Sequence, residues 1–433
     1  MRGSLAAGLI ALGMAGACGG SDDSNTGSSA AGNDGGGTGA SDAGTLADGA
    51  PIADSGKISG GDGSAASGGL KVVMGTGGSP GHIVDGSGTL VQLHGVDRSG
   101  TEDSCVYSAS TFDTPVDQNA VTAMKTWNVN AVRVPLNEDC WLGINQVMTG
   151  GSTYRDAIKA YVELLTSNNL IVILDLHWAA PGTEKAQGQL GMADADHAPT
   201  FWTQVATAYG NQPNVIFDLF NEPFITDWGC WLTGGTCAKD YNNADYESVG
   251  MATLIKTVRA TGANNVLILG GLGYSANFAE WVAKVKSIPT LPAPNDGISL
   301  TNIAASWHTY SSQSADTSCP GQYDGYSGTC ANGATTASNY GITGVLGAGF
   351  PVVIGEIGTD TYASSTPNFT SAQATMLDGW LESVLTSMDG QGQGYLGWDW
   401  NTSAPPLLIT NFDGTPTPHF GTTFKAHLLT RPK

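Results

Sequence analysis

The chain has 433 residues, a hydrophobic content of 41% and a formal net charge of −21. This length allows one large domain or two ordinary ones. The negative charge argues against a nucleic-acid partner, and no apolar run reaches the roughly 18 residues that a membrane helix needs.

The first 18 residues have the pattern of an export signal. Arg2 supplies the charged start, and residues 5–15 are apolar and small. Residues 15–18, Ala-Gly-Ala-Cys, resemble a bacterial lipobox, in which Cys18 would carry a lipid anchor. Alanine stands where the lipobox usually has leucine, so secretion without an anchor is the alternative. We therefore expect an exported protein, either a cell-surface lipoprotein or a secreted one.

Residues 19–70 consist almost entirely of Gly, Ser, Ala, Asp and Thr. Such a segment cannot bury enough apolar surface to offset the entropy that it would lose on ordering. It contains seven aspartates and one lysine, so it carries a net charge of −6. We predict a disordered, flexible tether that precedes a folded domain over residues 71–433.

From Leu70 onward, short apolar segments alternate with helical patterns. Most of these segments are short and apolar, as strands buried on both faces must be. Between them, sets such as Ile158, Tyr161, Val162 and Leu165 follow the i, i+3, i+4, i+7 spacing of an amphipathic helix. The predicted strands are Val91–Asp97, Ala131–Leu136, Leu170–Leu176, Val215–Phe220, Val266–Leu269, Ile303–Trp307, Val352–Gly355 and Tyr395–Trp398. Such alternation predicts an α/β fold, a (β/α)8 TIM barrel with enlarged loops.

A doubly wound open sheet would show the same alternation of strands and helices. It usually has fewer parallel strands and a glycine-rich phosphate loop after the first of them. Residues 95–100, Gly-Val-Asp-Arg-Ser-Gly, do not form that motif. The barrel is therefore the better interpretation.

The cysteines predict disulfides. If Cys18 carries a lipid, six others remain, and six allow fifteen pairings; export permits disulfides to form. Proximity in the sequence favours Cys230–Cys237 and Cys319–Cys330, which leaves Cys105–Cys140 to join the loops after the first two strands. A zinc site is the rival interpretation, but the chain contains no CxxC pair.

Polar and aromatic residues gather at the C-terminal ends of the predicted strands, where a barrel of this kind carries its active site. Two carboxyls at such ends are the usual equipment for cleaving a glycosidic bond, because one donates a proton to the departing sugar oxygen and the other attacks or stabilises the anomeric carbon. The strand-end residues are Arg133, His177, Asn221, Glu222, His308, Tyr310, Glu356 and Trp398.

The remaining residue types fit the same chemistry. An arginine such as Arg133 beside a carboxylate favours its ionised form, and Tyr310 could hold the same group by a hydrogen bond. The ring of Trp398 matches the apolar face of a pyranose, and Asn221 could bond the sugar 2-hydroxyl. Taken singly, each residue could be structural, as an ion pair, a core histidine or a packed ring. The joint pattern at six strand ends favours a catalytic site.

These motifs, from about Val72 to Lys433, resemble those of glycoside hydrolase family 5, within the clan of retaining (β/α)8 glycosidases. Residues 93–96, Leu-His-Gly-Val, are similar to the family's first strand, and residues 133–135, Arg-Val-Pro, to its second. Asp97 is a departure, because many members have asparagine there. The residues that match the family at later strand ends are His177, Asn221, Glu222, His308, Tyr310, Glu356 and Trp398.

The resemblance implies a retaining mechanism with Glu222 as acid/base and Glu356 as nucleophile. It implies that Arg133 and Tyr310 orient and ionise the nucleophile. It implies no cofactor and no metal. The −1 sugar subsite would be lined by His177, Asn221, His308 and Trp398.

The expected function is that of a monomeric endo-β-1,4-glucanase acting on a β-linked polysaccharide. An endo-β-1,4-mannanase is the alternative within the family, since the same core serves both. A non-catalytic, carbohydrate-binding surface lipoprotein is the alternative from another class, and the presence of both glutamates argues against it. The aromatic residues available to extend a cleft include Trp178, Trp228, Trp231 and Trp400.

Residues 194–197, Asp-Ala-Asp-His, follow the third predicted strand. Their side chains are of the types that bind metals. A polar loop that leads into a helix near Pro199 is the simpler interpretation, and it is the one we adopt at this point.

Overall fold

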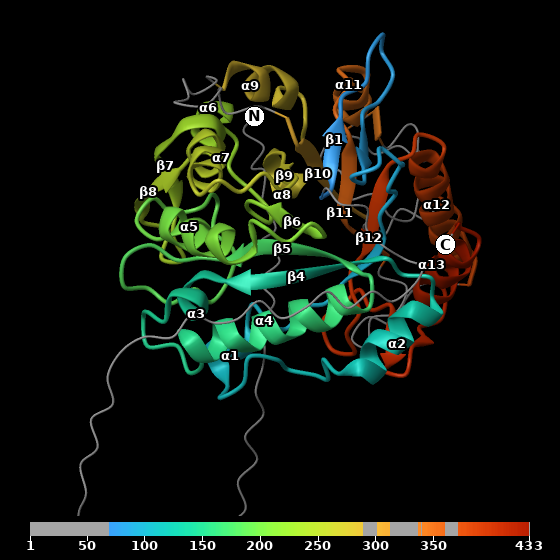
Figure 1. The fold of residues 1–433 in the computed structure, drawn as a ribbon, viewed down its shortest axis with the longest axis horizontal. Coiled ribbons are helices and arrows are strands. Elements are labelled where there is room, and N and C mark those ends of the chain that lie inside the picture. Colours follow the sequence, from blue (N-terminus) through green and yellow to red (C-terminus); the bar gives the residue numbers. More distant parts are fainter. Residues whose placement is uncertain (1–68, 289–300, 312–336, 339, 360–370, 433) are drawn as a thin grey trace, which may run out of the picture. The chain divides into compact units, whose positions relative to one another are not determined.

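The computed structural model describes residues 69–432, apart from 289–300, 312–336, 339 and 360–370. Parallel strands close into a barrel in the order β10-β11-β12-β3-β4-β5-β6-β9. The predicted (β/α)8 barrel is therefore confirmed (Figure 1). The barrel strands are β3 His94–Asp97, β4 Ala131–Asn137, β5 Ile171–Trp178, β6 Val215–Asp218, β9 Leu267–Gly270, β10 Ile303–Ser311, β11 Val352–Thr359 and β12 Gly394–Gly397.

Helices follow the strands and bury one face against the barrel. In α4 the buried positions include the predicted Ile158, Tyr161, Val162 and Leu165, and Figure 1 shows this helix alongside β4 and β5. The longer helices are α2 Gln118–Thr126, α4 Ser152–Ser167, α5 Ala198–Tyr209, α7 Met251–Ala260, α9 Trp281–Ser287, α12 Ser371–Asp389 and α13 Phe420–Leu429. The shorter ones are α1 Ser104–Tyr107, α3 Glu138–Leu142, α6 Trp228–Thr233, α8 Leu272–Ser275 and α11 Ile342–Gly347. None of the described helices combines the length and the hydropathy that crossing a bilayer requires.

Several strand ends differ from the sequence-based prediction. β3 begins at His94 rather than Val91, because the Val91 amide bonds to Ile83 of the preceding hairpin. β6 ends at Asp218, and β12 ends before Trp398. β11 continues beyond Gly355 to Thr359, so Glu356 lies within a strand and not just after one.

A small hairpin closes the N-terminal end of the barrel. It pairs β1 Lys71–Val73 with β2 His82–Val84 in antiparallel fashion. The Leu70 amide donates to Pro213, just before β6, and the Val72 amide donates to Asn302, just before β10. Leu70 also belongs to the apolar cluster that includes inward-facing strand residues. The hairpin thus fills the end opposite the predicted site.

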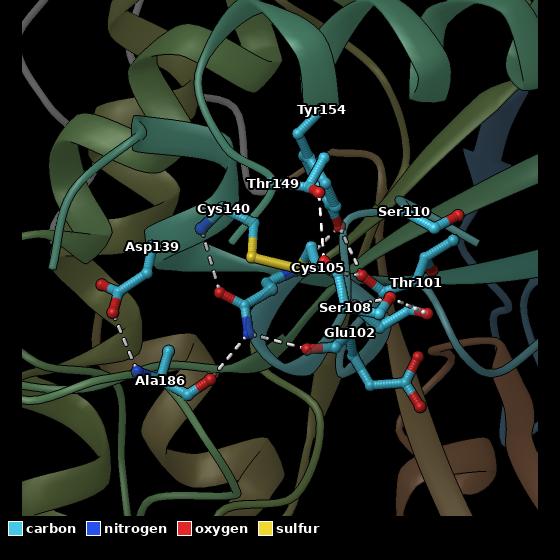
Figure 2. The surroundings of a disulfide bond; sticks show 12 residues. Thr101, Glu102, Cys105, Ser108, Ser110, Asp139, Cys140, Thr149, Tyr154 and Ala186 are labelled. Atoms are coloured by element: carbon cyan, nitrogen blue, oxygen red, sulfur yellow. Dashed lines mark hydrogen bonds between the residues drawn. A yellow bond between two sulfur atoms is a disulfide. The ribbon is translucent and has the colours of Figure 1, made fainter. Parts of the chain in front are cut away.

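Two of the three predicted disulfides are confirmed. Cys105 in α1 bonds to Cys140 in α3 (Figure 2), and Cys230 in α6 bonds to Cys237 in β7 Gly234–Lys239. The third pair, Cys319–Cys330, lies outside the described residues, as do Cys18 and residues 19–68 of the predicted tether. The remaining short strands are β8 Asp245–Val249, which pairs with β7, and the pair β13 Ile409–Asn411 and β14 Thr415–Pro416.

Candidate active site

Arg133 on β4 is fully buried and forms the centre of the site. Its Nη1 donates to Glu356 Oε1 at 2.8 Å, and its Nη2 donates to Asn221 Oδ1 at 2.8 Å. The guanidinium is planar and always charged, so these two contacts fix the directions of both side chains. The structure thus brings together three of the predicted residues from different strand ends.

Three aspartates complete the surroundings of Arg133. Asp97 Oδ1 lies 3.1 Å from Nη1, Asp175 Oδ2 lies 3.0 Å from Nη2, and Asp218 Oδ2 accepts from Nε at 3.1 Å. They occupy β3, β5 and β6, and Asp175 pairs in register with Asp218. Burial lowers the pKa of Arg133, but the carboxylates around it outweigh this effect and hold the pKa well above its ordinary value.

The same burial acts on the aspartates. It raises the pKa of Asp97 and of Asp218 well above the ordinary value, although the charge of Arg133 opposes the change. It raises the pKa of Asp175 to about 7, again against the attraction of Arg133. One arginine therefore faces more buried carboxyls than it can neutralise, and the carboxylate closest to it is that of Glu356.

Glu356 is held from two sides. Besides Arg133, the hydroxyl of Tyr310 on β10 donates to its Oε2. Burial, reinforced by the negative charge of Glu356, raises the pKa of Tyr310 well above its ordinary value, so the phenol remains a donor. Both contacts orient the carboxylate of Glu356, whose side chain is only 5% exposed.

A bulge in β11 aims Glu356 at its neighbours. The pairing of β10 with β11 shifts between Trp307 and His308, so that His308 stands opposite Glu356 and Gly355 has no partner of its own. A Cβ on Gly355 would lie 2.8 Å from His308 Nε2. Bulges of this kind re-aim side chains beside active sites, and here the bulge needs a glycine.

Glu222 lies beyond the end of β6 and receives two contacts. Its Oε1 lies 2.9 Å from His308 Nδ1, and its Oε2 accepts from Gln189 Nε2 at 3.0 Å. Burial raises the pKa of Glu222, while His177 and the bond from Gln189 oppose the change. No arginine forms an ion pair with Glu222 in the part of the chain that the structure describes.

His308 links the two glutamates. Its Nδ1 lies 2.9 Å from Glu222 Oε1 and 3.5 Å from Glu356 Oε2. One ligand-type atom from each of the three residues lies within 4.8 Å of the others. Burial lowers the pKa of His308 to about 3, so the ring is neutral and its contact with Glu222 is a hydrogen bond and not an ion pair.

The other predicted residues form a second wall. His177 Nδ1 lies 2.6 Å from Asp175 Oδ2, and its Nε2 lies 3.4 Å from Asn221 Nδ2. Burial lowers the pKa of His177 to about 4. The half-buried ring of Trp398 stacks on His177 with an interplanar angle of 11°. All eight sequence-predicted site residues therefore lie in one connected network.

The chain also matches a known family. The sequence profile "Cellulase (glycosyl hydrolase family 5)" matches residues 84–404, which is more than half of the chain. The chain belongs to glycosyl hydrolase family 5. The resemblance that the strand-end motifs indicate is therefore confirmed.

Curated members of family 5 are similar to this chain over part of their length. A cellulase from Thermoanaerobacterium sp. is 27% identical over 231 residues, which cover 52% of this chain and 49% of that protein. Endoglucanase E-5 from Thermobifida fusca is 22% identical over 288 residues, which cover 66% of this chain and 48% of that protein. The matched region thus spans about half the length of these two relatives, and less of others.

Solved structures confirm the family 5 barrel. A hyperthermophilic endocellulase from the archaeon Pyrococcus horikoshii superposes with a TM-score of 0.58 at 17% identity, over 83% of this chain and 99% of that one. A β-glucanase from Saccharophagus degradans, solved in complex with cellotetraose, gives a TM-score of 0.56 at 18% identity, over 83% and 93% of the two chains. At such identities these likenesses concern the fold.

Sequence reasoning missed some residues of this family 5 site. Asp175 and Asp218 were visible as charged residues within otherwise apolar strands, which is the signal that could have identified them as partners of Arg133. Gln189 lies in the loop between β5 and α5 and has no sequence signal of its own. Only the path of that loop in space brings its amide to Glu222.

The expectation for the aromatic residues was mostly wrong. Trp231 and Trp400 are fully buried, and Trp228 is 8% exposed, so they cannot extend a cleft. Trp231 donates to the Gly270 carbonyl at 2.9 Å, and Trp400 packs edge-to-face on Trp127. Of the four tryptophans, only Trp178 is half-buried, and the 59% exposed ring of Tyr107 lies edge-on to it.

Proposed function

We propose that this chain is a retaining endo-β-1,4-glucanase. The observation that carries the proposal is the spacing of Glu222 and Glu356, which bring one oxygen each, with a nitrogen of His308, to within 4.8 Å. Retaining glycosidases place their two carboxyls about 5–5.5 Å apart, whereas inverting ones need about 6.5–9.5 Å to admit a water. The spacing therefore supports direct attack by a carboxylate on the sugar.

Glu222 acts as the general acid in the first step. Its raised pKa keeps the carboxyl protonated to higher pH than an exposed glutamate. It transfers that proton to the glycosidic oxygen, so that the departing sugar leaves as an alcohol. Neutral His308, which donates to Oε1, keeps the carboxyl in place without competing as an acid.

Glu356 acts as the nucleophile in the same step. Arg133 and Tyr310 both donate a hydrogen bond to it and so orient it. As the bond to the leaving group breaks, a carboxylate oxygen bonds to the anomeric carbon and forms a glycosyl-enzyme. In the second step Glu222, now ionised, takes a proton from water, and the water displaces Glu356 with net retention.

Asn221, His177 and Trp398 line the subsite of the reacting sugar. Asn221 Oδ1 is bonded to Arg133, so its Nδ2 is free to donate to the sugar 2-hydroxyl as well as to His177. Such a bond strengthens in the transition state. The ring of Trp398 offers a face to the pyranose on the side away from His177.

Export of the protein is part of the proposal. The signal pattern over residues 1–18, with Cys18 as the candidate lipid site, supports a surface lipoprotein or a secreted enzyme. The disulfides Cys105–Cys140 and Cys230–Cys237 support an oxidising compartment. We propose residues 19–70 as a linker and 71–433 as the catalytic domain; the contacts of Leu70 with the barrel support that boundary.

The division of labour is tested with Glu222→Ala and Glu356→Ala, using Glu163→Gln on the exposed face of α4 as the control. Glu356→Ala should turn over no substrate, because no glycosyl-enzyme can form. Glu222→Ala should still react with an aryl β-glycoside whose leaving group needs no proton, and it should then stall with the sugar on Glu356. Mass spectrometry should detect this adduct, and azide should release it as a β-glycosyl azide.

Inverted products would show that Glu356 is not the nucleophile, and the retaining mechanism would be wrong. The substrate is tested with soluble polysaccharides and reducing-end detection. We expect internal cleavage of carboxymethyl cellulose or mixed-linkage β-glucan. Faster cleavage of mannan would make the enzyme a mannanase, release of monosaccharide alone would make it exo-acting, and binding without cleavage would make it a non-catalytic binding protein.

A further inference from the structure

A second group of carboxyls lies in and beside the loop 179–197, which connects β5 to α5. We name it the loop cluster: Glu138, Asp194, Asp196 and His197. Glu138 and Asp194 are fully buried, whereas the side chains of Asp196 and His197 are 49% and 20% exposed. The cluster is therefore open to solvent on one side only.

Each carboxylate of the loop cluster has one oxygen fixed by a backbone amide. Glu138 Oε2 accepts from Ala180 N at 3.3 Å, Asp194 Oδ1 from His197 N at 2.7 Å, and Asp196 Oδ2 from Gly182 N at 2.7 Å. The other oxygens of the two buried residues, Glu138 Oε1 and Asp194 Oδ2, have no hydrogen-bond partner among the described residues. A buried carboxylate oxygen without a donor needs a proton, a water or a cation as its partner.

These carboxyls also lie against one another. The carboxyls of Glu138 and Asp196 both lie close enough to that of Asp194 to share a proton with it. Over the described part of the chain, no lysine or arginine comes within ion-pair distance of any of them. His197 Nδ1 lies 3.7 Å from Asp194 Oδ1, 3.9 Å from Asp196 Oδ1 and 4.0 Å from Glu138 Oε2, which is too far for a hydrogen bond.

We propose that the loop cluster binds a divalent cation of the Mn²⁺ type. One ligand atom each from Asp194, Asp196 and His197 lies within 4.8 Å of the others. Ligands on opposite sides of a calcium-sized ion, at about 2.3–2.6 Å, are about that far apart. Carboxylate oxygens suit Mn²⁺ as they suit Ca²⁺ and Mg²⁺, whereas an imidazole suits transition metals, so a mixed set favours a transition-metal ion such as Mn²⁺. Glu138 supplies a further buried oxygen. His197 Nδ1 donates to the Ala180 carbonyl at 3.1 Å, so to bind the ion through Nδ1 the ring must give up this bond and carry its proton on Nε2.

Neighbouring Asp139 is not a ligand in this proposal. Its Oδ2 accepts from Ala186 N at 2.8 Å (Figure 2). Its Oδ1 accepts from Asn145 Nδ2 at 3.0 Å, so both oxygens are occupied. Asp139 fixes the middle of the loop 179–197 to α3, next to the disulfide at Cys140. The cation would fix both ends of the same loop, whose Gln189 contacts Glu222.

A proton shared between carboxyls is the alternative way to offset their repulsion. Burial and contact with Asp196 raise the pKa of Asp194 to about 7, as a shared proton would require. A direct binding measurement separates the two. The full chain is stripped with EDTA and titrated with Mn²⁺, and free Mn²⁺ is followed by its EPR signal. We expect one saturable site per chain.

Three variants locate that site. Asp194→Asn should weaken Mn²⁺ binding by about tenfold or more, whereas Asp156→Asn, an exposed carboxylate on α4, should leave it unchanged. Glu356→Gln should also leave it unchanged, which matters because Glu222, His308 and Glu356 form another cluster of ligand-type groups. If Glu356→Gln abolishes binding and Asp194→Asn does not, the ion binds among the catalytic residues and the proposal is wrong.

If Asp194→Asn does not fold, Asp196→Asn replaces it as the test variant. The side chain of Asp196 is half exposed, so its substitution leaves no buried polar group without a partner. The metal-free form of this variant should melt like the wild type, but Mn²⁺ should raise the melting temperature of the wild type alone. A stripped wild-type chain that takes up no Mn²⁺, and whose melting temperature Mn²⁺ does not move, would show that the carboxyls share a proton and would overturn the proposal.

Discussion

Two clusters of carboxyls, most of them buried, lie in the barrel strands and in the loop that follows β5, and they differ in the source of their positive charge. In the arginine cluster, Asp97, Asp175, Asp218 and Glu356 surround Arg133. In the loop cluster, Glu138, Asp194 and Asp196 lie close together, and among the described residues His197 is the one basic group within ion-pair distance of them. Buried carboxylates need a positive charge or a proton. In the arginine cluster the positive charge belongs to Arg133, a residue of the chain, and is always present. The loop cluster must bind a cation or a proton from solution.

Removing the positive charge of Arg133 should have the largest effect on stability. Arg133→Met would leave four buried carboxyls without a cation, and breaking a buried ion pair in this way costs about 3–5 kcal/mol of unfolding free energy. Activity should also be lost, since Glu356 and Asn221 lose their shared donor. Urea unfolding measures the stability, and reducing-end release measures the activity.

Arg133→Lys is the matched control. It keeps the charge but loses the planar fork, so it should recover part of the stability and little of the activity. If Arg133→Met costs less than about 1 kcal/mol, the aspartates hold protons and do not rely on the arginine, and the contrast between the clusters disappears.

Adding Mn²⁺ to the loop cluster should have the next largest effect on the free energy of unfolding. If the loop cluster binds Mn²⁺ in the folded chain alone, a concentration of 100 times Kd stabilises the fold by about 2.7 kcal/mol. We expect this gain in urea unfolding of the stripped wild type. Asp194→Asn should show no such gain, and Arg133→Lys should keep it, because the arginine cluster does not depend on added cations.

Removing the hydrogen bond from Gln189 to Glu222 should have a smaller effect, which the pH dependence of kcat/KM would show. Gln189 donates to Glu222, and this bond stabilises the ionised form and lowers the pKa against the effect of burial. Gln189→Leu should therefore raise the pKa of Glu222 further. Because the general acid must be protonated, the basic limb of kcat/KM should move to higher pH, with less than about a tenfold change at the optimum.

A shift of the basic limb to lower pH, or no shift with an equal loss at every pH, would show that Gln189 acts only on the shape of the loop. Gln187→Leu, two residues away and exposed, is the matched control and should leave the profile unchanged.

A partly exposed arginine should have the smallest effect. Arg431 pairs with Asp389 at the other end of the barrel, and its side chain is 26% exposed. Asp389 also accepts from His427, Gln92 and Tyr395, so it stays bonded when Arg431 is removed. Arg431→Met should cost about 1 kcal/mol or less in urea unfolding. A cost equal to that of Arg133→Met would mean that burial does not explain the difference.

The sequence predicted the barrel and the site residues at its strand ends, but not the contacts made by the loops or the burial of the tryptophans. Strand ends with Arg133, Glu222 and Glu356 were visible because a parallel barrel brings the C-terminal ends of its strands together. The contact from Gln189 was not visible, since it depends on how a long loop folds back. The buried state of Trp231 and Trp400 was missed because a tryptophan beside a site can pack inward or outward, and its neighbours in space decide which.

The loop cluster shows the same limit. The pattern Asp-Ala-Asp-His at 194–197 suggested metal ligands, and a polar loop was the simpler interpretation. Glu138 is the residue that favours a metal site over a polar loop. It lies over fifty residues earlier, and its carboxyl meets Asp194 only in the folded chain. Spacing along the sequence could not predict that contact.

The unpaired glycine in β11 affects how mutational scans of this site should be interpreted. An alanine at position 355 would place its methyl group 2.6 Å from Ser306 Oγ and 2.8 Å from His308 Nε2, so something must move. Neither neighbour can retreat easily, because both are buried. In an alanine scan, Gly355→Ala would therefore lose activity much as substitutions of the two glutamates do. Gly355 has no side chain that could contact a sugar, so this loss would come from steric crowding and not from a role in the reaction.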